Sequence, residues 1–243
     1  MTTIRSILFL ALLPASVAVF APLILMARPF GRSAAYSIGR GWSNIVLWSC
    51  RILCGIDFAV EGRENIPDDI GVVFIKHSSA YETIALFQFF PQQCWVVKRE
   101  LIRLPFFGWA LAALHSIAID RNAGHSAVEQ VIEQGKRRLT EGLWIMIFPE
   151  GTRMAPGETR RYGVSGTLLA QAAGRLIVPV AHNAGDFWPR RALRLQPGTV
   201  RFCIGPPIDP TDRKPREVNS EIQNWIETKV AELRKPMRGS ALS

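Results

Sequence analysis

A histidine and a glutamate five residues apart follow a hydrophobic stretch of the chain. The segment KHSSAYETIALF, residues 76–87, contains His77 and Glu82. On a continuous helix two side chains at this spacing diverge by about 140°, so they can meet only if His77 lies in a loop and Glu82 in the first helical turn. The carboxylate would then fix the histidine tautomer and leave the other ring nitrogen to accept a proton. On the pair alone, a capping histidine beside a solvated glutamate is the better interpretation.

A basic segment with aromatic neighbours comes next, VVKRELIRLPFFGWAL at residues 96–111. Lys98 and Arg99 come directly after an apolar, strand-like run. Two cations at a strand end could hold a phosphate group, and the aromatic residues that follow could meet lipid. Taken alone, the segment indicates only a basic loop before a helix.

The segment IMIFPEGTRM, residues 145–154, places four functional residue types after a hydrophobic strand. These are Glu150, Gly151, Thr152 and Arg153, in which the glycine permits an unusual turn. Arginine is the preferred bidentate partner of phosphate oxygens. A plain surface turn is the weaker interpretation because the polar groups are so concentrated. A fourth segment, LIVPVAHNAG at residues 176–185, predicts a strand whose Pro179 suits an edge or a bulge, and we interpret His182 as a structural or loop histidine.

Short apolar runs alternate with longer helical patterns through the body of the chain. Predicted strands cover Val72–Lys76, Cys94–Val97, Ser116–Ile119, Leu143–Phe148, Leu176–Ala181 and Val200–Ile204. Predicted helices cover Thr83–Phe90, Phe106–Leu114, a helix opened by a capping box at Ser126–Glu129, Val164–Gly174 and Arg216–Lys235. This alternation predicts an α/β fold with a mixed, largely parallel sheet flanked by helices. Chemistry in such sheets gathers at the loops after the carboxyl ends of the strands.

The segment before this body is apolar enough to meet a membrane. Ile7–Met26 holds twenty uncharged residues, sufficient as a helix for a bilayer core. Pro14 and Pro22 leave a kinked span or a re-entrant segment open, and we favour an uncleaved anchor over a signal peptide. Trp42–Phe58 fits an interfacial helix or an ordinary core helix about equally. We therefore divide the chain into a membrane anchor with an interfacial helix, residues 1–58, and a domain of residues 59–243.

The charge balance favours an anionic partner. Lysine and arginine outnumber acidic residues 29 to 20 in 243 residues, a formal charge of +9. Nucleic acid is not expected as the partner, because the basic residues are dispersed and an apolar anchor fits it poorly. The arginines that follow the anchor place the rest of the chain on the cytoplasmic side. The four cysteines form no CxxC pair, so no metal site is expected.

The four segments, in this order, resemble the motifs of the bacterial glycerolipid acyltransferase family, and specifically its lysophosphatidic acid acyltransferases. The first family motif is a histidine, four residues and an acid. The second is matched by Lys98, Leu101, Pro105 and Gly108, the third by Phe148 to Arg153, and the fourth by Val178 to Val180. The resemblance covers residues 60 to 210. Glu82 stands where aspartate is commoner, and Met154 where a serine often follows the arginine.

The resemblance implies transfer of a fatty acyl group from coenzyme A or acyl carrier protein to the free hydroxyl of lysophosphatidic acid. His77 would be the general base and Glu82 its orienting partner. Arg153 would hold the acceptor phosphate, supported by Lys98 and Arg99. The family also places Glu150, Gly151 and Thr152 of the third motif at the acceptor site. No cofactor is implied, since the acyl thioester is a co-substrate, and the implied location is the inner membrane of a bacterium with the domain facing the cytoplasm.

Other functions remain open at this point. The same chemistry could act on another acceptor, such as lyso-ornithine lipid. A non-catalytic lipid-binding membrane protein would explain the anchor and the charge, but not His77 with Glu82. A serine hydrolase is less favoured because GVSGT, residues 163–167, departs from GxSxG at its last position.

Overall fold

The structure of the chain is a computed structural model that describes residues 2–90, 92–120 and 123–234. In chain order its elements are α1 (Thr2–Ala27), η1 (Arg28–Phe30), α2 (Arg32–Cys54), β1 (Ile56–Glu61), η2 (Arg63–Asn65), β2 (Val72–Ile75), α3 (Tyr81–Ala85), η3 (Leu86–Gln88), β3 (Gln93–Lys98), α4 (Arg99–Ile102), α5 (Phe107–Ala113), β4 (Ile117–Ile119), α6 (His125–Thr140), β5 (Trp144–Ile147), α7 (Ser165–Ala173), β6 (Ile177–His182), α8 (Ala184–Phe187), β7 (Gly198–Ile204) and α9 (Pro215–Arg234). Lys235, which we expected to end the last helix, lies outside the described residues.

The strands of the described residues form a seven-stranded sheet in the order β1-β7-β6-β2-β5-β3-β4. Five neighbouring strands, β6, β2, β5, β3 and β4, run parallel, whereas β7 pairs antiparallel with β6 and carries β1 beside it. The sheet is therefore mixed and largely parallel, which confirms the expected fold class. Parallel neighbours end at the same edge, so the loops after β2, β5 and β6 meet there.

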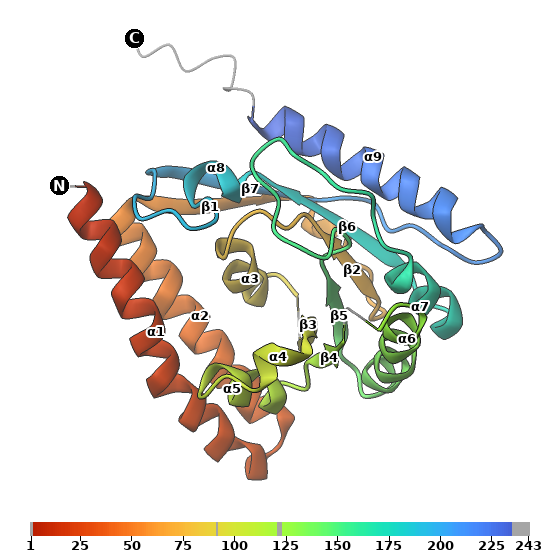
Figure 1. Cartoon of the computed structure of the whole chain (residues 1–243), viewed down its shortest axis with the longest axis horizontal. Helices are drawn as coiled ribbons and strands as arrows, with labels where there is room; N and C mark the ends of the chain where they lie inside the picture. The colour runs from red at the N-terminus through yellow and green to blue at the C-terminus, as the bar shows by residue number, and fades with distance from the viewer. Residues whose placement is uncertain (1, 91, 121–122, 235–243) are drawn as a thin grey trace.

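Alternate residues of β2 separate the two faces of the sheet. Val73 and Ile75 pack into a core shared with α1, α2 and α3, whereas Val72 and Phe74 pack into a core shared with α6, α7 and α9. We call these the α1–α2 face and the α9 face. Figure 1 shows the two layers of helices on either side of the sheet. Because both faces are covered, β2 is buried over its whole length and contains only apolar residues.

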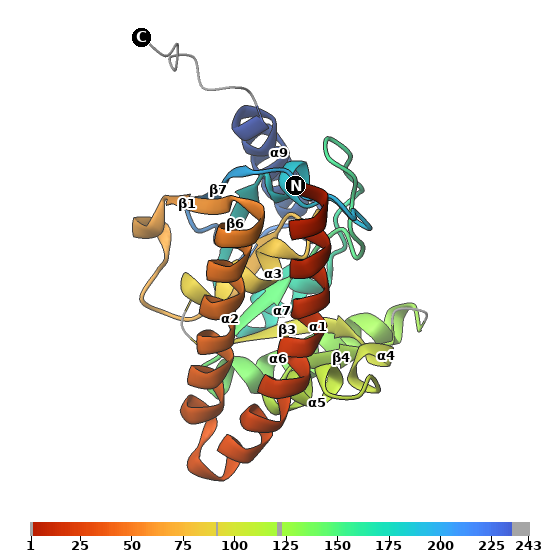
Figure 2. The same ribbon diagram turned by 90° about the vertical axis from the view of Figure 1, so that its left-hand side faces the viewer.

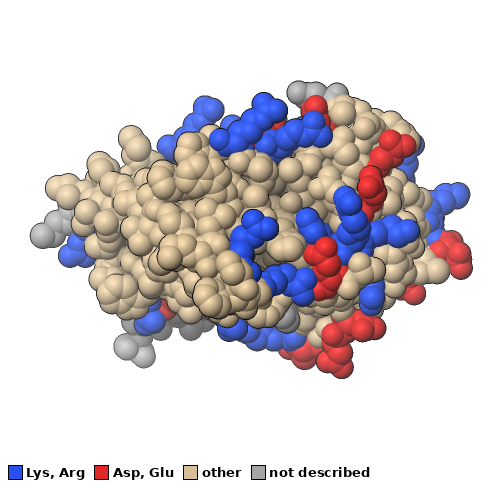
Figure 3. Space-filling view, turned by 90° about the horizontal axis from the view of Figure 1, so that it is seen from below, with Lys and Arg blue, Asp and Glu red and all other residues tan. Residues whose placement is uncertain are grey.

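Helices α1 and α2 form an antiparallel pair along one side of the molecule, where they lie side by side (Figures 1 and 2). Among the described residues, one stretch, Thr3–Phe30, is long and apolar enough by length and composition to cross a membrane. Much of its apolar surface is exposed, and the outer side of α2 also exposes Ile45, Trp48 and Ile52. Seen from below, the surface over these two helices carries few charged side chains, whereas charges gather over the rest (Figure 3).

Helix α2 differs from the helix expected at Trp42–Phe58. It begins ten residues earlier, at Arg32, and ends at Cys54, after which Gly55 adopts a left-handed conformation with φ 68°. Such a glycine ends a helix by satisfying its last carbonyls, and Gly55 N–H donates to Arg51 O. Residues 56–58, expected to be helical, instead open strand β1. Strand β1 was not predicted as a strand, because its short apolar run directly follows the helical pattern.

The prediction that Pro179 lies at an edge or a bulge is wrong about the edge. Strand β6 lies inside the sheet, paired with β2 on one side and β7 on the other. The carbonyl of Pro179 accepts a hydrogen bond from Gly205 N–H, just beyond the end of β7. Strand β7 ends at Ile204, and its pairing with β6 begins at Val180. Pro179 therefore lies just outside this pairing, where the missing N–H of proline removes no ladder hydrogen bond.

The expected capping box of Ser126 and Glu129 is also wrong. Helix α6 begins at His125, one residue earlier, after Gly124. Ser126 therefore lies within the first turn, and its hydroxyl accepts a hydrogen bond from Gln130 Nε2 at 3.3 Å. A side chain can cap only from the non-helical position before the helix, and here that position is a glycine.

Candidate active site

His77 and Glu82 meet at the carboxyl edge of the sheet. His77 lies in the loop after β2, and Glu82 is the second residue of α3, the arrangement that their spacing required. His77 Nδ1 lies 2.8 Å from Glu82 Oε1. Since a carboxylate accepts, Nδ1 carries the proton in this contact, and the lone pair of Nε2 is left to accept one. The alternative of a solvated glutamate fails because the Glu82 side chain is 0% exposed.

Glu82 is held as a carboxylate by its surroundings. The backbone N–H groups of Ser78 and Ser79 also donate to Glu82 Oε1, at 3.2 and 3.0 Å. Burial alone would raise the pKa of the Glu82 carboxyl, but His182 and the hydrogen bonds from His77 and Ser79 outweigh burial and hold this pKa below its usual range. An ionised Glu82 both orients the His77 ring and stabilises the imidazolium that forms when Nε2 takes a proton.

The His77 ring is also fixed by stacking. It lies 3.7 Å from the Phe148 ring, centroid to centroid, at an interplanar angle of 17°. Phe148 in turn stacks on Trp95 of β3, at 5.2 Å. Phe148 opens the loop after β5, so the third segment of the sequence supplies one wall of the histidine site. A ring held by Glu82 and by Phe148 has little freedom to rotate away.

An apolar cavity of about 210 Å³ lies beside His77. Helices α1 and α2, residues of α3 and η3, and the segment from β3 to α5 provide most of its wall. Among the described residues that line it, His77 and Arg153 are those with ionisable side chains. The apolar wall includes Phe20, Ile24, Trp42, Phe107, Leu111 and Leu114. A cavity of this composition suits a hydrocarbon chain whose polar end reaches His77.

The three predicted cations separate in the structure. Arg153 lines the cavity together with His77. Lys98 is the last residue of β3 and Arg99 the first of α4, one residue earlier than the expected position after the strand. Both are exposed, and neither is among the residues that line the cavity. Lys98 Nζ lies 2.9 Å from Glu100 Oε1, and Arg99 donates to Gln130 Oε1 of α6. The structure therefore brings Arg153 to the histidine and leaves Lys98 and Arg99 outside the cavity wall.

Glu150 lies below the histidine loop and not in the cavity wall. Its Oε1 accepts from Lys76 Nζ at 2.7 Å, and its Oε2 accepts from the backbone N–H of His77 at 3.0 Å. Burial raises the pKa of Glu150, although Lys76 and the His77 N–H oppose that shift. Gly151 follows with φ 71°, a conformation that favours glycine, and Thr152 is half-buried beside it.

Sequence reasoning missed Lys76, whereas the structural role expected of His182 fits its contacts. Lys76 is 1% exposed, and its ammonium group contacts Glu150 and Glu227. His182, expected to be structural, is buried and donates through Nε2 to the carbonyl of Lys76 at 2.7 Å. The sequence did contain one indication that Lys76 is buried. In the alternating pattern of β2, position 76 lies on the same face of the sheet as the buried Val72 and Phe74. Among the described residues no group of three His, Cys, Asp or Glu side chains is placed to hold a metal ion.

The chain was compared with known proteins. The model of the family described as Acyltransferase matches residues 57–183. A 1-acyl-sn-glycerol-3-phosphate acyltransferase of Pseudomonas aeruginosa is 40% identical over 235 residues, which cover 95% of this chain and 91% of the relative. One of the same name from Borreliella burgdorferi is 31% identical over 70% of this chain and 67% of its own. The chain belongs to the acyltransferase family.

The fold of this acyltransferase is also found in a solved structure. The crystal structure of the 1-acyl-sn-glycerophosphate acyltransferase PlsC from Thermotoga maritima has a TM-score of 0.81 and covers 97% of each chain, at 21% sequence identity. At that identity the likeness establishes the fold. The family match includes β2, β5 and β6 with their loops, whereas α9 of this acyltransferase lies beyond the matched residues.

Proposed function

We propose that the protein transfers a fatty acyl group from a thioester to the free hydroxyl of 1-acyl-sn-glycerol 3-phosphate, lysophosphatidic acid, and so forms phosphatidic acid. The observation that carries this proposal is the His77–Glu82 pair beside an apolar cavity that Arg153 also lines. The names of the similar proteins from P. aeruginosa and B. burgdorferi support the same acceptor. Coenzyme A or acyl carrier protein would carry the acyl group.

The proposed reaction needs one base and no covalent intermediate. His77 Nε2 removes the proton of the acceptor hydroxyl while the oxygen attacks the thioester carbonyl. The carbon–sulfur bond then breaks, and the imidazolium returns its proton to the departing thiolate, so His77 is restored. Glu82 keeps Nδ1 protonated throughout and balances the transient positive charge. General-base assistance of this kind contributes about 10²–10⁴ in rate.

The two substrates would meet at His77 from different directions. We place the acyl chain in the apolar cavity, with its carbonyl carbon next to His77, and the acceptor phosphate on Arg153. Lys98 and Arg99 would attract the anionic substrate from outside the cavity wall. Gly151 and Thr152 remain candidates for the acceptor site. Since Glu150 is committed to Lys76 and to the His77 N–H, we assign it to the support of the histidine loop.

We further propose that α1 and α2 lie in the membrane surface and do not span it. The start of α1 is bonded to the body, through Ser6 Oγ and Leu195 N at 3.1 Å. The end of α1 also packs on the body, where Ile24 shares a core with Ala113 of α5. A spanning α1 would separate those two contacts by the thickness of a bilayer, which the attached body forbids. The exposed apolar side would instead be immersed in the cytoplasmic leaflet of the inner membrane.

An acceptor competition assay tests the proposed function. Purified protein in anionic lipid vesicles would receive one acyl thioester together with equal amounts of lysophosphatidic acid and lyso-ornithine lipid. We expect phosphatidic acid as the main product. Dominant acylation of lyso-ornithine lipid would assign another acceptor, and no turnover with either coenzyme A or carrier-protein thioesters would leave a lipid-binding protein. Running both thioesters separately identifies the donor.

Two variants test the residue assignments. Arg153→Lys keeps the positive charge but loses the bidentate geometry, so the acceptor KM should rise about tenfold while the donor KM changes little. An unchanged acceptor KM would remove Arg153 from the phosphate site. Glu82→Gln should lose most activity, because an amide can present its NH₂ group to Nδ1 and favour the wrong tautomer, whereas Glu82→Asp should keep part of it.

A further inference from the structure

A buried lysine lies directly before the proposed base and points to the opposite side of the sheet. Lys76 follows Phe74 by two residues, and Phe74 packs in the core of the α9 face, whereas Ile75 packs in the core of the α1–α2 face. The alternation of a strand therefore directs Lys76 to α9 and His77 to the cavity. Consecutive residues thus connect the two faces at the edge where the reaction is proposed.

The ammonium group of Lys76 is surrounded by acceptors. Its Nζ donates to Glu150 Oε1 at 2.7 Å, to the backbone carbonyl of Glu158 at 2.6 Å, and to Glu227 at 2.9 and 3.1 Å. The lysine is 1% exposed and the Glu150 side chain is 0% exposed. The ammonium and the Glu150 carboxylate are therefore shielded from water and interact with little screening, whereas the Glu227 side chain is 23% exposed and closes the site from its rim.

Glu150 connects this cluster to the backbone of His77. One oxygen of its carboxylate binds Lys76 Nζ and the other binds the His77 N–H at 3.0 Å. The carbonyl of His77 is bonded to Met154 N at 2.8 Å, and the carbonyl of Lys76 to His182 Nε2. A shift of the Glu150 carboxylate would therefore move the peptide that carries the His77 side chain.

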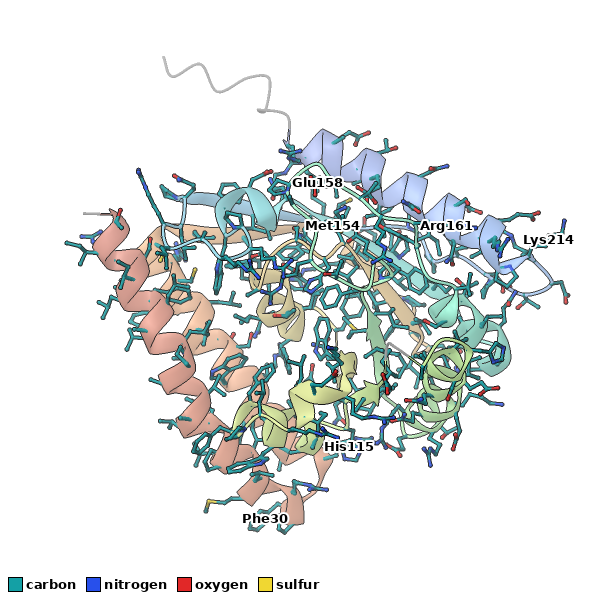
Figure 4. All side chains as sticks on the ribbon, in the orientation of Figure 1. Phe30, His115, Met154, Glu158, Arg161 and Lys214 are labelled. Carbon is teal, nitrogen blue, oxygen red and sulfur yellow. The ribbon has the colours of Figure 1, made fainter. Side chains whose placement is uncertain are left out.

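Glu227 anchors the far end of the cluster. It lies on α9, 151 residues from Lys76 in the chain. Besides Lys76 it accepts from Thr159 Oγ1 at 3.0 Å and from Tyr162 OH at 3.1 Å. Thr159 and Tyr162 belong to the loop that follows Arg153, and this loop, with Met154, Glu158 and Arg161 labelled, runs beside α9 (Figure 4). Helix α9 is thereby bonded to the loops of both the proposed base and the proposed phosphate ligand.

Stability alone does not account for such a cluster. Taking the charges of Lys76 and Glu150 out of water is costly, and well-packed apolar residues of similar volume often stabilise a protein as much or more. The α9 face already provides an apolar core from Val218, Ile222, Ile226, Val230 and Leu233. The charged groups instead fix the orientation of the Glu150 carboxylate, because each of its two oxygens accepts a hydrogen bond.

We infer that Glu227 is a positioning residue for acyl transfer: through Lys76 and Glu150 it fixes the backbone of His77, so that Nε2 faces the acceptor hydroxyl. The inference rests on the proposed function, since the rate that reports it is that of acyl transfer. Glu227 touches no reacting atom in this scheme. Replacing it by glutamine, whose amide oxygen can still accept from Thr159 and Tyr162 of the Arg153 loop, should therefore lower kcat and leave the binding of both substrates nearly unchanged.

The first test compares Glu227→Gln with Glu221→Gln on the same helix. Both changes remove one negative charge and keep the side-chain length, but Glu221 is 47% exposed and pairs with Arg213 at the surface. We expect Glu227→Gln to lower kcat about tenfold per folded molecule, with both KM values within twofold of wild type. Glu221→Gln should keep wild-type kcat. Glu227→Asp, which restores the charge, should recover part of the loss.

The second test asks whether Glu227→Gln has the opposite effect on kcat when Lys76 is absent. At a pH high enough to keep Glu150 ionised despite its raised pKa, Lys76→Met leaves Glu150 and Glu227 as neighbouring carboxylates without their shared cation. Glu150 should then turn away from the His77 N–H, and kcat should fall further than in Glu227→Gln. Adding Glu227→Gln to Lys76→Met removes that repulsion. The same substitution that slows the wild-type enzyme should therefore speed up the Lys76→Met variant, by about threefold or more, a reversal that simple loss of folded protein does not produce.

The outcomes separate this inference from the proposed function. If wild-type protein transfers no acyl group, the proposed function fails. If wild type is active and Glu227→Gln keeps kcat within twofold, or loses activity only in proportion to the folded fraction measured by circular dichroism, the positioning role is overturned. A rise in either KM without a fall in kcat would also overturn it. Should Lys76→Met not fold, the Glu227 and Glu221 pair of variants still decides the question.

Discussion

The two faces of the sheet bury similar apolar side chains but differ in what they show to the outside. On the α9 face, α9 buries a row of aliphatic residues and turns charged residues to the surface. On the α1–α2 face, both helices bury one side. The exposed side of α1 is also apolar, and α2 exposes Ile45, Trp48 and Ile52 beside two arginines; the cavity lies beneath the two helices. An amphipathic helix needs only one apolar side to pack on a sheet. The exposed apolar residues of α1 and α2 are therefore not explained by packing on the sheet, and they fit the proposed contact with lipid. Under that proposal we call the α1–α2 face the binding face and the α9 face the supporting face.

The change with the largest expected effect is on the binding face. His77→Ala removes the proposed base and should lower kcat by about 10²–10⁴-fold. The free energy of unfolding should fall by only about 1–3 kcal/mol, since buried Glu82 loses one hydrogen-bond donor but keeps those of Ser78 and Ser79. Steady-state acyl transfer and urea unfolding of the same preparation measure both quantities. Near-normal acyl transfer by the variant would refute the assignment of the base.

The matching change on the α9 face should have the opposite profile. Ile222 is fully buried in the core between α9 and the sheet. Ile222→Ala should cost about 2–5 kcal/mol of unfolding free energy, from lost burial and the cavity left behind. The kcat of the molecules that remain folded should stay near that of wild type. A large loss of kcat without loss of stability would show that the two faces are not divided as proposed.

The placement of the proposed site residues at one edge could be predicted from the sequence, because a parallel sheet brings the loops after its strands to the same edge. His77 lies in the loop after β2, and Glu150 and Arg153 lie in the loop after β5. Adjacent parallel strands bring such loops to one place. The contact between Glu82 and His77 could be predicted because the two residues are five positions apart, with His77 in a loop and Glu82 in the first turn of the next helix. These inferences needed only the order of elements and the spacing within a loop.

The parts that could not be predicted depend on contacts between distant segments. Glu227 meets Lys76 across 151 residues, and no spacing rule connects them. Lys98 was expected beside the acceptor phosphate, but the direction of a long, exposed side chain is set by neighbours such as Glu100, which the motif does not specify. Strand β1 was missed because its pairing with β7, not its own pattern, makes it a strand.

A third prediction concerns His182, a buried titratable group at the end of β6 on the binding face. Burial lowers its pKa below the ordinary value of 6.5, although Glu82 opposes that shift. Below pH 6.5 the unfolded chain therefore binds a proton at this position that the folded chain does not bind. Stability contributed by His182 is thus present above pH 6.5 and is lost as the pH falls, by at most about 1.4 kcal/mol per pH unit.

A His182→Gln variant isolates this contribution. Glutamine can still donate to the carbonyl of Lys76 but does not titrate. Between pH 7 and pH 5 the unfolding free energy of wild type should fall more steeply than that of the variant. Equal slopes would mean that His182 titrates alike in both states. Glu150 acts with the opposite sign, since its raised pKa favours the folded state as the pH falls, but it is present in both proteins and cancels.

The smallest effect should come from the exposed apolar side of α2. Trp48 is 65% exposed in the structure, and its transfer to a bilayer interface should contribute about 1 kcal/mol. Trp48→Ser should therefore weaken binding to anionic vesicles about fivefold in a flotation assay, without lowering stability. Lys214→Ser, at the start of α9, removes a positive charge from the supporting face and should leave binding unchanged. If Lys214→Ser weakened binding as much as Trp48→Ser, net charge and not the apolar side of α1 and α2 would govern attachment, and the contrast between the two faces would fail at the point where it meets the membrane.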